Sequence, residues 1–445
     1  MKVGLLSLGF PNFRYDYGEK YLKISIGRLK SDAYTLITCG RILIDEQSIN
    51  QEIDRLRKEN INLLIIQCGT YSYGSSMLKV IEMLEDIPLL LWGFPEPIIE
   101  GERGLPLNSL CGLNMYGSFL KKVNKKFSYV YGSVEDEVTY KKVQRTIQAV
   151  SIKNTLKQSK FCVIGGRVPG FYLSNVDEIR FRHEIGPEIV YYSIASLLED
   201  AGKINDQIVN DEVKKMKTEV CCVTTTDAML VKSARLYLAI KAFQEKNAIQ
   251  GFAIKCWPEF QQLYQSSVCG VVSRLNNEGI MTSCEGDVTG LVTMYMQHLI
   301  TKQPCFFADL VNINDEGIVK AWHCGPAPIC LARDHSTTQY CEHPTIKQGI
   351  GFAVEFKMLL GRLTMIKLKE GHEGYKFFIA TGTGVEEDRD LVANQADIRF
   401  DSTAEQLLDT IMEHGIEHHY AIVYHEIKDD LLEVCKWMNI EPIIV

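Results

Sequence analysis

The sequence lacks the paired cysteines of the common small zinc and redox motifs. It contains 14 cysteines in 445 residues, and no two of them form a Cys-x-x-Cys pair. This absence excludes the simplest zinc-ribbon and thioredoxin-like sites. The cysteines lie in apolar runs, as Cys162 does, or beside candidate site residues, as Cys284 and Cys324 do. Thiols scattered in this way predict a reducing compartment rather than a disulfide framework.

Long basic runs and long apolar runs are also missing. The formal net charge is -8, and no basic cluster is present that would bind the phosphates of a nucleic acid. The most apolar segment, Ile87–Trp92, is far too short to span a bilayer. The first residues, Lys2–Leu6, do not lead into the apolar stretch of a signal peptide. These absences predict a soluble, cytoplasmic protein without a nucleic-acid or membrane partner.

A complete G-x-G-x-x-G motif is absent as well. Gly165-Gly166-Arg167, followed by Pro169-Gly170, resembles a phosphate-cradling turn but does not have the spacing of a dinucleotide-binding fingerprint. A nucleotide site is therefore disfavoured.

The first third of the sequence alternates between apolar runs and helical patterns. A chain of 445 residues is expected to form two or three domains. Short apolar runs at Val3–Leu8, Leu63–Cys68 and Pro88–Trp92 predict buried parallel strands, and Ser48–Lys58 and Ser76–Glu85 have helical spacing. Strands joined by helical crossovers indicate a parallel α/β sheet. The polar helical stretch 135–157 then reads as a connector.

A second α/β unit begins at Phe161-Cys162-Val163. Its expected strands are Ile249–Cys256, Ile280–Cys284 and Cys305–Ile313, and its expected helices are Glu188–Glu199, Ala228–Lys246 and Val288–Ile300. After about residue 320, Glu355–Lys369 and Tyr375–Gly384 alternate like antiparallel strands, and the chain closes with a helix at Asp429–Met438 and a strand at Pro442–Val445. The predicted domains are residues 1–157, 158–318 and 319–445.

Histidines and carboxylates indicate where chemistry could occur. The first 182 residues contain no histidine, and nine of the ten histidines lie from His298 onward. Candidate site residues lie at four places. Glu285 with Asp287 and then Asp309 each end an apolar run, His323 lies in Trp322-His323-Cys324-Gly325-Pro326, and the pair His418-His419 precedes the strand-like Tyr420–Tyr424. Carboxylates and imidazoles together suit Mn²⁺ or Mg²⁺ with positions left for substrate oxygens. Such a cation would stabilise the negative charge of an enediolate.

Plainer interpretations apply to the same residues. An acid at the end of a strand, such as Asp287, is more often the N-cap of the next helix. A His-His pair at the start of a strand usually directs one ring inward and one outward, so at most one of His418 and His419 is expected to be a ligand. The residues alone therefore indicate metal-assisted chemistry and no particular reaction.

The region from Glu285 to Asp309 resembles the L-fucose isomerase family. There, a segment of the type T-E-N-D-x-x-N-G-V-x-M is followed after a helix by F-A-D-V. This sequence has Cys284-Glu285-Gly286-Asp287-Val288-Thr289-Gly290-Leu291-Val292-Thr293-Met294 and then Phe307-Ala308-Asp309-Leu310. Gly165–Tyr172 is similar to the family's G-G-R-S-x-G-x-Y, and His419 with Tyr424 is similar to its N-H-x-x-x-x-Y segment. The G-E-G-D segment of L-arabinose isomerases matches Glu285-Gly286-Asp287 still more closely.

This resemblance implies a site and a fold. Glu285, Asp309, His323 and His419 would be the metal ligands. Glu285 and Asp309 would also be the acid/base pair, working through a cis-enediol. The implied fold is α/β, with two Rossmann-like parallel α/β domains followed by a small antiparallel β-barrel-like C-terminal domain. The implied assembly is a homo-trimer or homo-hexamer in which a neighbouring subunit's N-terminal domain helps to close the pocket.

Departures from the family pattern concern the residues expected around the sugar. Lys255-Cys256-Trp257-Pro258-Glu259 replaces the segment rich in Gln and Arg that contacts sugar in L-fucose isomerases, and His418 replaces the Asn before the C-terminal His. These changes predict the same reaction on another sugar. The expected substrate-binding residues are Arg14, Trp92, Trp257, Lys255 and His418.

The sequence therefore predicts a metal-dependent aldose–ketose isomerase. Its expected substrate is an open-chain pentose, hexose or modified hexose, and its expected cofactor is Mn²⁺, with Mg²⁺ or Co²⁺ as alternatives. Two other functions fit the same residues. One is a metal-dependent sugar epimerase or aldolase, and the other is a non-catalytic sugar-binding protein.

Overall fold

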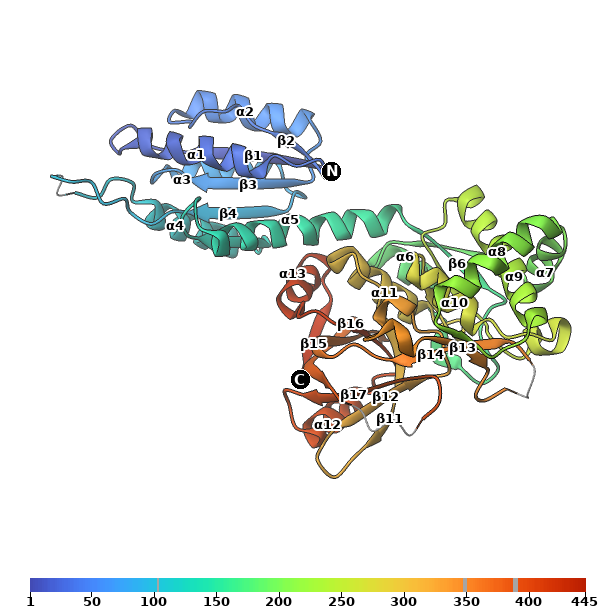
Figure 1. The fold of residues 1–445 in the computed structure, drawn as a ribbon. Helices are drawn as coiled ribbons and strands as arrows, with labels where there is room; N and C mark the ends of the chain where they lie inside the picture. Colours follow the sequence, from blue (N-terminus) through green and yellow to red (C-terminus); the bar gives the residue numbers. More distant parts are fainter. Residues whose placement is uncertain (102–103, 347–349, 387–390) are drawn as a thin grey trace. The chain divides into compact units, whose positions relative to one another are not determined.

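The computed structural model of the protein describes residues 1–101, 104–346, 350–386 and 391–445. It divides into two units, Met1–Asn154 and Thr155–Val445 (Figure 1). The first unit is built on a parallel sheet, whereas the second combines a parallel sheet with a larger mixed sheet. The three-domain division expected from the sequence stays a prediction.

The first unit contains five parallel strands. Their order is β2 (Thr35–Ile37), β1 (Lys2–Leu8), β3 (Leu63–Cys68), β4 (Leu89–Gly93) and β5 (Phe127–Tyr131). All six residues of β3 are buried, which explains why the strand reads as a continuous apolar run. The strands predicted at Val3–Leu8, Leu63–Cys68 and Pro88–Trp92 are confirmed.

Helices cover this sheet. They are α1 (Tyr15–Leu29), α2 (Glu46–Lys58), α3 (Gly74–Met83), α4 (Ser109–Lys122) and α5 (Glu137–Gln158). Apolar residues of α2, α3 and α4 share one core with the strands, whereas the guanidinium of Arg28 in α1 lies over the ring of Tyr140 in α5. The helices predicted at Ser48–Lys58 and Ser76–Glu85 and the helical connector are confirmed, with ends shifted by about two residues, as is usual for helix boundaries.

The second unit opens with a four-stranded parallel sheet. Its order is β10 (Met281–Ser283), β9 (Gly251–Ile254), β6 (Lys160–Ile164) and β7 (Glu188–Tyr192). The surrounding helices are α6 (Glu178–Glu184), α7 (Ile194–Gly202), α8 (Asp206–Glu219), α9 (Asp227–Asn247), α10 (Cys269–Asn277) and α11 (Val288–Thr301).

The helix predicted at Glu188–Glu199 is wrong in its first half. Residues Glu188–Tyr192 form strand β7, because the run Ile189–Tyr192 consists of β-branched and aromatic residues that favour strands. Ser193 then caps α7, and its side chain accepts a hydrogen bond from the backbone N–H of Ser196.

The remaining strands form a ten-stranded mixed sheet. Its order is β19 (Glu441–Ile444), β16 (Gly374–Val385), β15 (Gly361–Gly371), β18 (His419–Val423), β11 (Phe306–Ile313), β12 (Val319–His323), β17 (Asn394–Phe400), β14 (Phe352–Lys357), β13 (Gln339–Glu342) and β8 (Cys222–Val223). Strand β16 also pairs with β17. A barrel-like closure of these strands stays a prediction.

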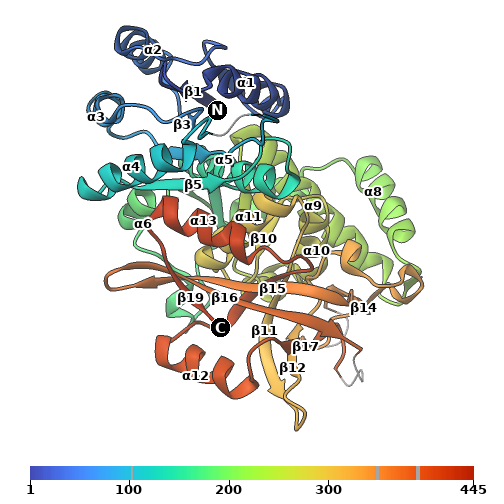
Figure 2. The same ribbon diagram turned by 90° about the vertical axis from the view of Figure 1, so that its left-hand side faces the viewer.

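The sequence position of strand β11 suggested that it belongs to the parallel sheet. The structure places it in the mixed sheet instead. It is joined to β12 by a short hairpin and pairs antiparallel with both β12 and β18. A hairpin can join only antiparallel strands. Helices α12 (Ala404–His414) and α13 (Lys428–Met438) lie on opposite sides of the β15–β16 pair (Figures 1 and 2).

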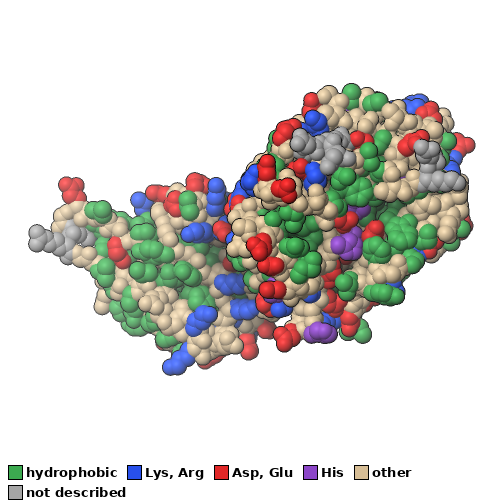
Figure 3. Space-filling view, turned by 90° about the horizontal axis from the view of Figure 1, so that it is seen from below, with side chains coloured by type: hydrophobic (Ala, Val, Ile, Leu, Met, Phe, Trp, Pro, Cys, Tyr) green, Lys and Arg blue, Asp and Glu red, His purple; other side chains and the backbone are tan. Residues whose placement is uncertain are grey.

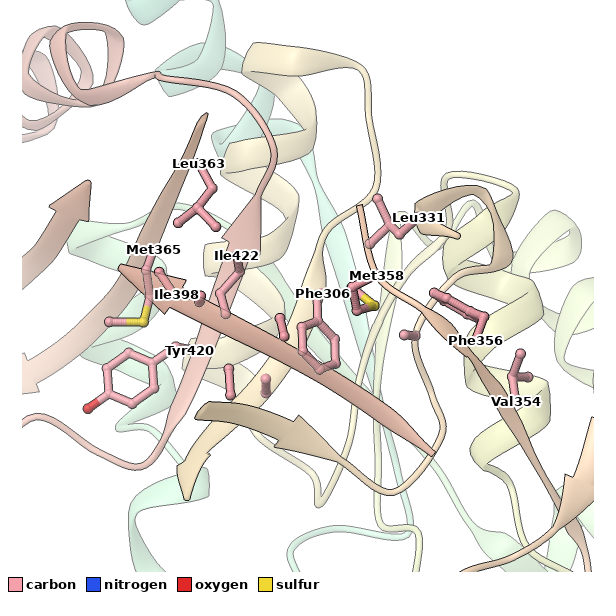
Figure 4. Close-up of a cluster of buried hydrophobic side chains, with 14 of the residues drawn as sticks. Phe306, Leu331, Val354, Phe356, Met358, Leu363, Met365, Ile398, Tyr420 and Ile422 are labelled. Carbon is pink, nitrogen blue, oxygen red and sulfur yellow. The ribbon is translucent and has the colours of Figure 1, made fainter. Parts of the chain in front are cut away.

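A buried apolar cluster fixes the strands of the mixed sheet against one another. Phe306 of β11 lies opposite Ile422 of β18 in the strand register, and both side chains are fully buried. Figure 4 shows these two residues together with others from neighbouring strands, including Met365 and Ile398. Close packing of this kind resists displacement, so it holds rigid the residues that follow Phe306 and precede Ile422.

The surface has the mixed character expected from the net charge. On the face shown in Figure 3, Lys and Arg side chains are interspersed with Asp and Glu side chains. Within the described part of the chain, no helix is both long enough and apolar enough to cross a membrane.

Candidate active site

The loop between β10 and α11 places Glu285 in an unusual backbone conformation. Glu285 has φ of 60° and Gly286 has φ of 71°, so a residue other than glycine lies in the left-handed region. Such strain is concentrated at functional sites. A Cβ at position 286 would lie 2.4 Å from the carbonyl oxygen of Gly166. Only glycine fits there, and the loops that follow β10 and β6 therefore meet at Glu285.

Strand pairing brings Asp309 and His419 together. Asp309 of β11 is the direct register partner of His419 of β18, so their side chains project from the same face of the sheet. His419 Nε2 lies 3.7 Å from Asp309 Oδ1 and 3.2 Å from Glu285 Oε2. Three residues expected to be ligands thus meet at one nitrogen atom.

A buried ion pair orients the His419 ring. His419 Nδ1 lies 3.0 Å from Asp287 Oδ2, and Lys367 Nζ donates to the same carboxylate oxygen at 2.8 Å. The other Asp287 oxygen accepts from the backbone N–H of Gly290 at 2.7 Å, so the N-cap interpretation of Asp287 is confirmed. Because the carboxylate accepts the Nδ1–H, it is Nε2 that faces Glu285 and Asp309, and a cation bound there would meet the Nε2 lone pair in place of its proton. This carboxylate–histidine arrangement is typical of metal-binding histidines.

His323 and Asp309 carry buried polar atoms without a partner. His323 ends β12, is 4 % exposed, and has its ring centroid 6.2 Å from that of His419. Neither His323 Nε2 nor Asp309 Oδ1 has a hydrogen-bond partner among the described residues. Leaving such atoms unsatisfied is costly. A bound cation would satisfy Asp309 Oδ1 directly, and it would satisfy His323 Nε2 if the ring changed tautomer, because His323 Nδ1 accepts the backbone N–H of Cys324 at 2.8 Å. The donor set therefore fits a divalent cation.

His418, Trp257 and Phe171 form an aromatic rim beside Glu285. The Trp257 indole Nε1 lies 3.5 Å from Glu285 Oε1, and the His418 Nε2 lies 3.9 Å from Glu285 Oε2. The Phe171 ring contacts both, with centroids 5.9 Å from Trp257 and 5.5 Å from His418. His418 points outward with 56 % of its side chain exposed, whereas only 2 % of the His419 side chain is exposed. Flat apolar rings of this kind suit the C–H face of a sugar.

A cavity of about 280 Å³ adjoins His419. It is lined by Gly170, Phe171, Tyr172, Leu173, Ser174, Asp287, Lys367, Glu417, His418 and His419. It shares Phe171 and His418 with the aromatic rim. Lys255, also expected to bind substrate, forms an ion pair with Glu259.

The charges around His419 control its protonation. Burial alone would raise the pKa of Glu285, but hydrogen bonds from His418 and His419 hold that pKa well below its usual range. Burial would lower the pKa of His419, but Asp287 and then Glu285 raise it above 6.5. Without a cation, the carboxylates therefore retain a proton on this imidazole. A metal ion bound there would have to displace that proton.

Arg14 and Trp92 belong to the first unit. Arg14 pairs with Asp16 at 2.9 Å. Trp92 is 1 % exposed and donates its indole N–H to the Gly132 carbonyl at 3.2 Å, so its ring presents little surface to a sugar. Substrate binding by these two residues stays a prediction.

Several residues of the site were not expected from the sequence. Lys367 lies in an alternating strand pattern where a charged residue normally faces solvent, and nothing nearby indicates its ion pair with Asp287. Phe171 lies in the Gly165–Tyr172 segment quoted for the family resemblance, but a lone aromatic residue in a loop gives no indication of a rim.

The chain is similar to known sugar isomerases. Residues 322–444 match the family model described as the L-fucose isomerase C-terminal domain. A sulfoquinovose isomerase of Priestia aryabhattai is 25 % identical over 436 residues, covering 98 % of this chain and 97 % of that protein. A second, of Clostridium sp. (strain MSTE9), is 26 % identical over 445 residues, covering 99 % and 98 %. An L-arabinose isomerase of Levilactobacillus brevis is 24 % identical over 310 residues, covering 63 % of this chain and 64 % of that protein.

Proposed function

Because the chain belongs to the L-fucose and L-arabinose isomerase family and is an aldose–ketose isomerase, we propose that it converts sulfoquinovose into the corresponding 2-ketose with the help of a divalent cation. The substrate is supported by the two sulfoquinovose isomerases that align over almost the whole chain. The L-arabinose isomerase aligns over 63 % of it. Sulfoquinovose is a hexose modified at C6, within the substrate range expected from the sequence.

The observation that carries the metal proposal is the convergence of Glu285, Asp309 and His419 beside buried atoms without partners. His419 Nε2 is 3.2 Å from Glu285 and 3.7 Å from Asp309, while Asp309 Oδ1 and His323 Nε2 lack partners among the described residues. These four residues would hold the cation, with Mn²⁺ as the first choice and Mg²⁺ or Co²⁺ as alternatives. When bound, it would polarise the sugar carbonyl and the neighbouring hydroxyl.

The residues of the chain would then move one proton between neighbouring carbons. We assign the transfer between C2 and C1 to Glu285 and Asp309, whose carboxylates approach the same nitrogen from two different sheets. One carboxylate accepts the proton from C2 as O1 takes up the proton of the O2 hydroxyl, which gives a cis-enediol deprotonated at O2, and the same carboxyl proton is then returned to C1 as the C2=O bond forms. Asp287 keeps His419 oriented, and the aromatic rim of Trp257, Phe171 and His418 would cover the sugar. Exclusion of water protects the intermediate.

The test is an assay of chelator-treated protein with sulfoquinovose, glucose and L-arabinose, with and without added Mn²⁺. We expect a ketose from sulfoquinovose only when metal is restored. Glu285→Gln and Asp309→Asn should each lower kcat at least 1,000-fold, because a proton-transfer group contributes about 10²–10⁴-fold and each is also a ligand.

Asp315→Asn is the matched control, since Asp315 is exposed in the same β11–β12 hairpin and should leave kcat unchanged. Full activity of Glu285→Gln in chelated buffer would disprove the metal proposal. Turnover of glucose but not of sulfoquinovose would disprove only the proposed substrate and would leave the metal proposal in place.

A cytoplasmic location and assembly as a homo-trimer or homo-hexamer belong to the same proposal. All 14 cysteines are free, which is consistent with a reducing compartment. The assembly rests on the family resemblance.

A further inference from the structure

Two cysteines and one histidine gather beside the proposed ligands without having a part in the reaction. Cys269 begins α10, Cys324 follows β12, and His343 follows β13. The two sulfur atoms are 3.7 Å apart, and Cys269 Sγ lies 3.1 Å from His343 Nε2. One potential donor atom from each residue lies within 4.8 Å of the others.

The contacts of His343 favour a hydrogen-bonded thiol pair over a metal site. Its Nδ1 accepts from the backbone N–H groups of Thr345 and Ile346 at 3.3 and 3.2 Å. A neutral imidazole carries one N–H, so that hydrogen lies on Nε2 and points toward the Cys269 sulfur. A metal ion would need the Nε2 lone pair instead.

Cys324 connects this pair to the proposed site. It directly follows His323, and its Sγ lies 3.3 Å from His323 Nδ1. The next residue, Gly325, has φ of 104°, and a Cβ there would lie 2.4 Å from Cβ of Ala353. Because the chain after Cys324 is so closely packed, a displacement of Cys324 is transmitted back to His323.

We propose that Cys269 and Cys324 are an oxidisable thiol pair, a modification site at which a peroxide introduces a disulfide bond. Cys324, the less buried residue of the two, attacks hydrogen peroxide through its sulfur, and a sulfenic acid and one water result. The Cys269 thiol then attacks that sulfur, the disulfide forms and a second water leaves. Each thiol loses one hydrogen, and the peroxide gains the two electrons.

Disulfide formation would move the Cys324 sulfur. The S–S distance must shorten from 3.7 Å to about 2.05 Å, which draws Cys324 toward Cys269 and would change its 3.3 Å contact with His323 Nδ1. The expected consequence is reversible loss of isomerase activity. This effect on activity rests on the proposed role of His323, whereas the cross-link itself does not.

The experiment treats the reduced, full-length protein with hydrogen peroxide, blocks the remaining thiols and maps disulfides by mass spectrometry. We expect a peptide that links Cys269 to Cys324 and at least a fivefold loss of activity that dithiothreitol restores. Cys269→Ser should give no linked peptide and keep its activity after peroxide. Cys330→Ser is the control, because Cys330 is exposed and outside the pair, and this variant should respond like the wild type.

Oxidation of Cys330 in the wild-type protein shows that the peroxide has reacted. Absence of the linked peptide from such protein would overturn the proposal, and this measurement does not depend on whether a variant folds. Release of one zinc ion per chain on thiol modification would overturn it in favour of a metal site. A linked peptide with unchanged activity would keep the modification site and disprove only its effect on His323.

Discussion

Lys367 and Asp287 form an ion pair that is almost completely shielded from water, with 1 % and 3 % of their side chains exposed. Removing Lys367 leaves the buried Asp287 carboxylate with the His419 imidazole at 3.0 Å but without its lysine, and breaking a buried ion pair is strongly destabilising. Lys367→Met should therefore lower the free energy of unfolding by about 3–5 kcal/mol, measured by urea denaturation. Lys376→Met is the matched control, because Lys376 pairs with Glu441 on the surface and its loss should cost less than about 1 kcal/mol. Equal effects of the two variants would contradict the role assigned to the buried pair.

The protonation of His419 predicts how cation binding depends on pH. Asp287 and Glu285 raise its pKa above 6.5, so at mildly acidic pH a proton occupies the imidazole that a cation would need. Lowering the pH should weaken Mn²⁺ binding by about tenfold per pH unit for each proton displaced. The affinity measured by calorimetry between pH 8 and pH 6 checks this. An affinity independent of pH would exclude His419 as a ligand.

Two glycines allow the effect of a close contact to be separated from that of backbone strain. Gly286 lies in the loop from β10 to α11, and Gly166 lies in the loop that follows β6. Gly286 and Gly166 have φ of 71° and 80°. An added Cβ would meet a carbonyl oxygen at 2.4 Å at position 286, whereas nothing lies within 4 Å at position 166. Gly166→Ala should cost about 1–2 kcal/mol through strain alone. Gly286→Ala should cost more and also lower kcat, because Glu285 must shift; both stability and kcat are measured for each variant.

At the scale of helices and strands, most elements could be predicted from the sequence. The prediction failed where pairing between distant strands decides which sheet a strand joins. Buried strands such as β3 are recognisable because both faces are covered, and α11 begins where its Asp287 cap indicates. Strand β7 was mistaken for a helix because the four-residue run Ile189–Tyr192 carries little periodicity. Strand β11 was grouped with the parallel strands because its pairing with β18 depends on residues more than 100 positions away, which no local pattern contains.

At the scale of the whole molecule, the aromatic rim of the site in the second unit is exposed. His418 is 56 % exposed on its side chain, and Trp257 and Tyr172 are 38 % and 74 % exposed. An enediol needs protection from water, so a second chain is expected to complete the enclosure. Sedimentation analysis should give a mass three or six times 50.5 kDa, and specific activity should fall on dilution to the monomer. A fully active monomer would contradict this expectation.

The candidate ligands were proposed from the sequence through family motifs, and the structure brings Glu285, Asp309 and His419 together. Their arrangement could not be foreseen, because it depends on the register between β11 and β18 and on a loop from another sheet. Trp257 and His418 of the aromatic rim were expected to bind substrate, whereas Lys367 and Phe171 were missed for the same reason. Their partners are distant in the sequence, and a single lysine or phenylalanine is common on any strand or loop.

The opposition of Asp287 and His419, which are 132 positions apart, also has a consequence for folding. Contacts between residues so distant in the chain require the closure of a long loop, and topologies rich in such contacts form slowly. The proposed cation site would therefore be absent from partly folded chains, and a cation would bind the native state alone. Free cation at 100 times its dissociation constant would then add about 2.7 kcal/mol to the free energy of unfolding, so the supply of metal in the cell would govern how long each molecule survives as well as how fast it works.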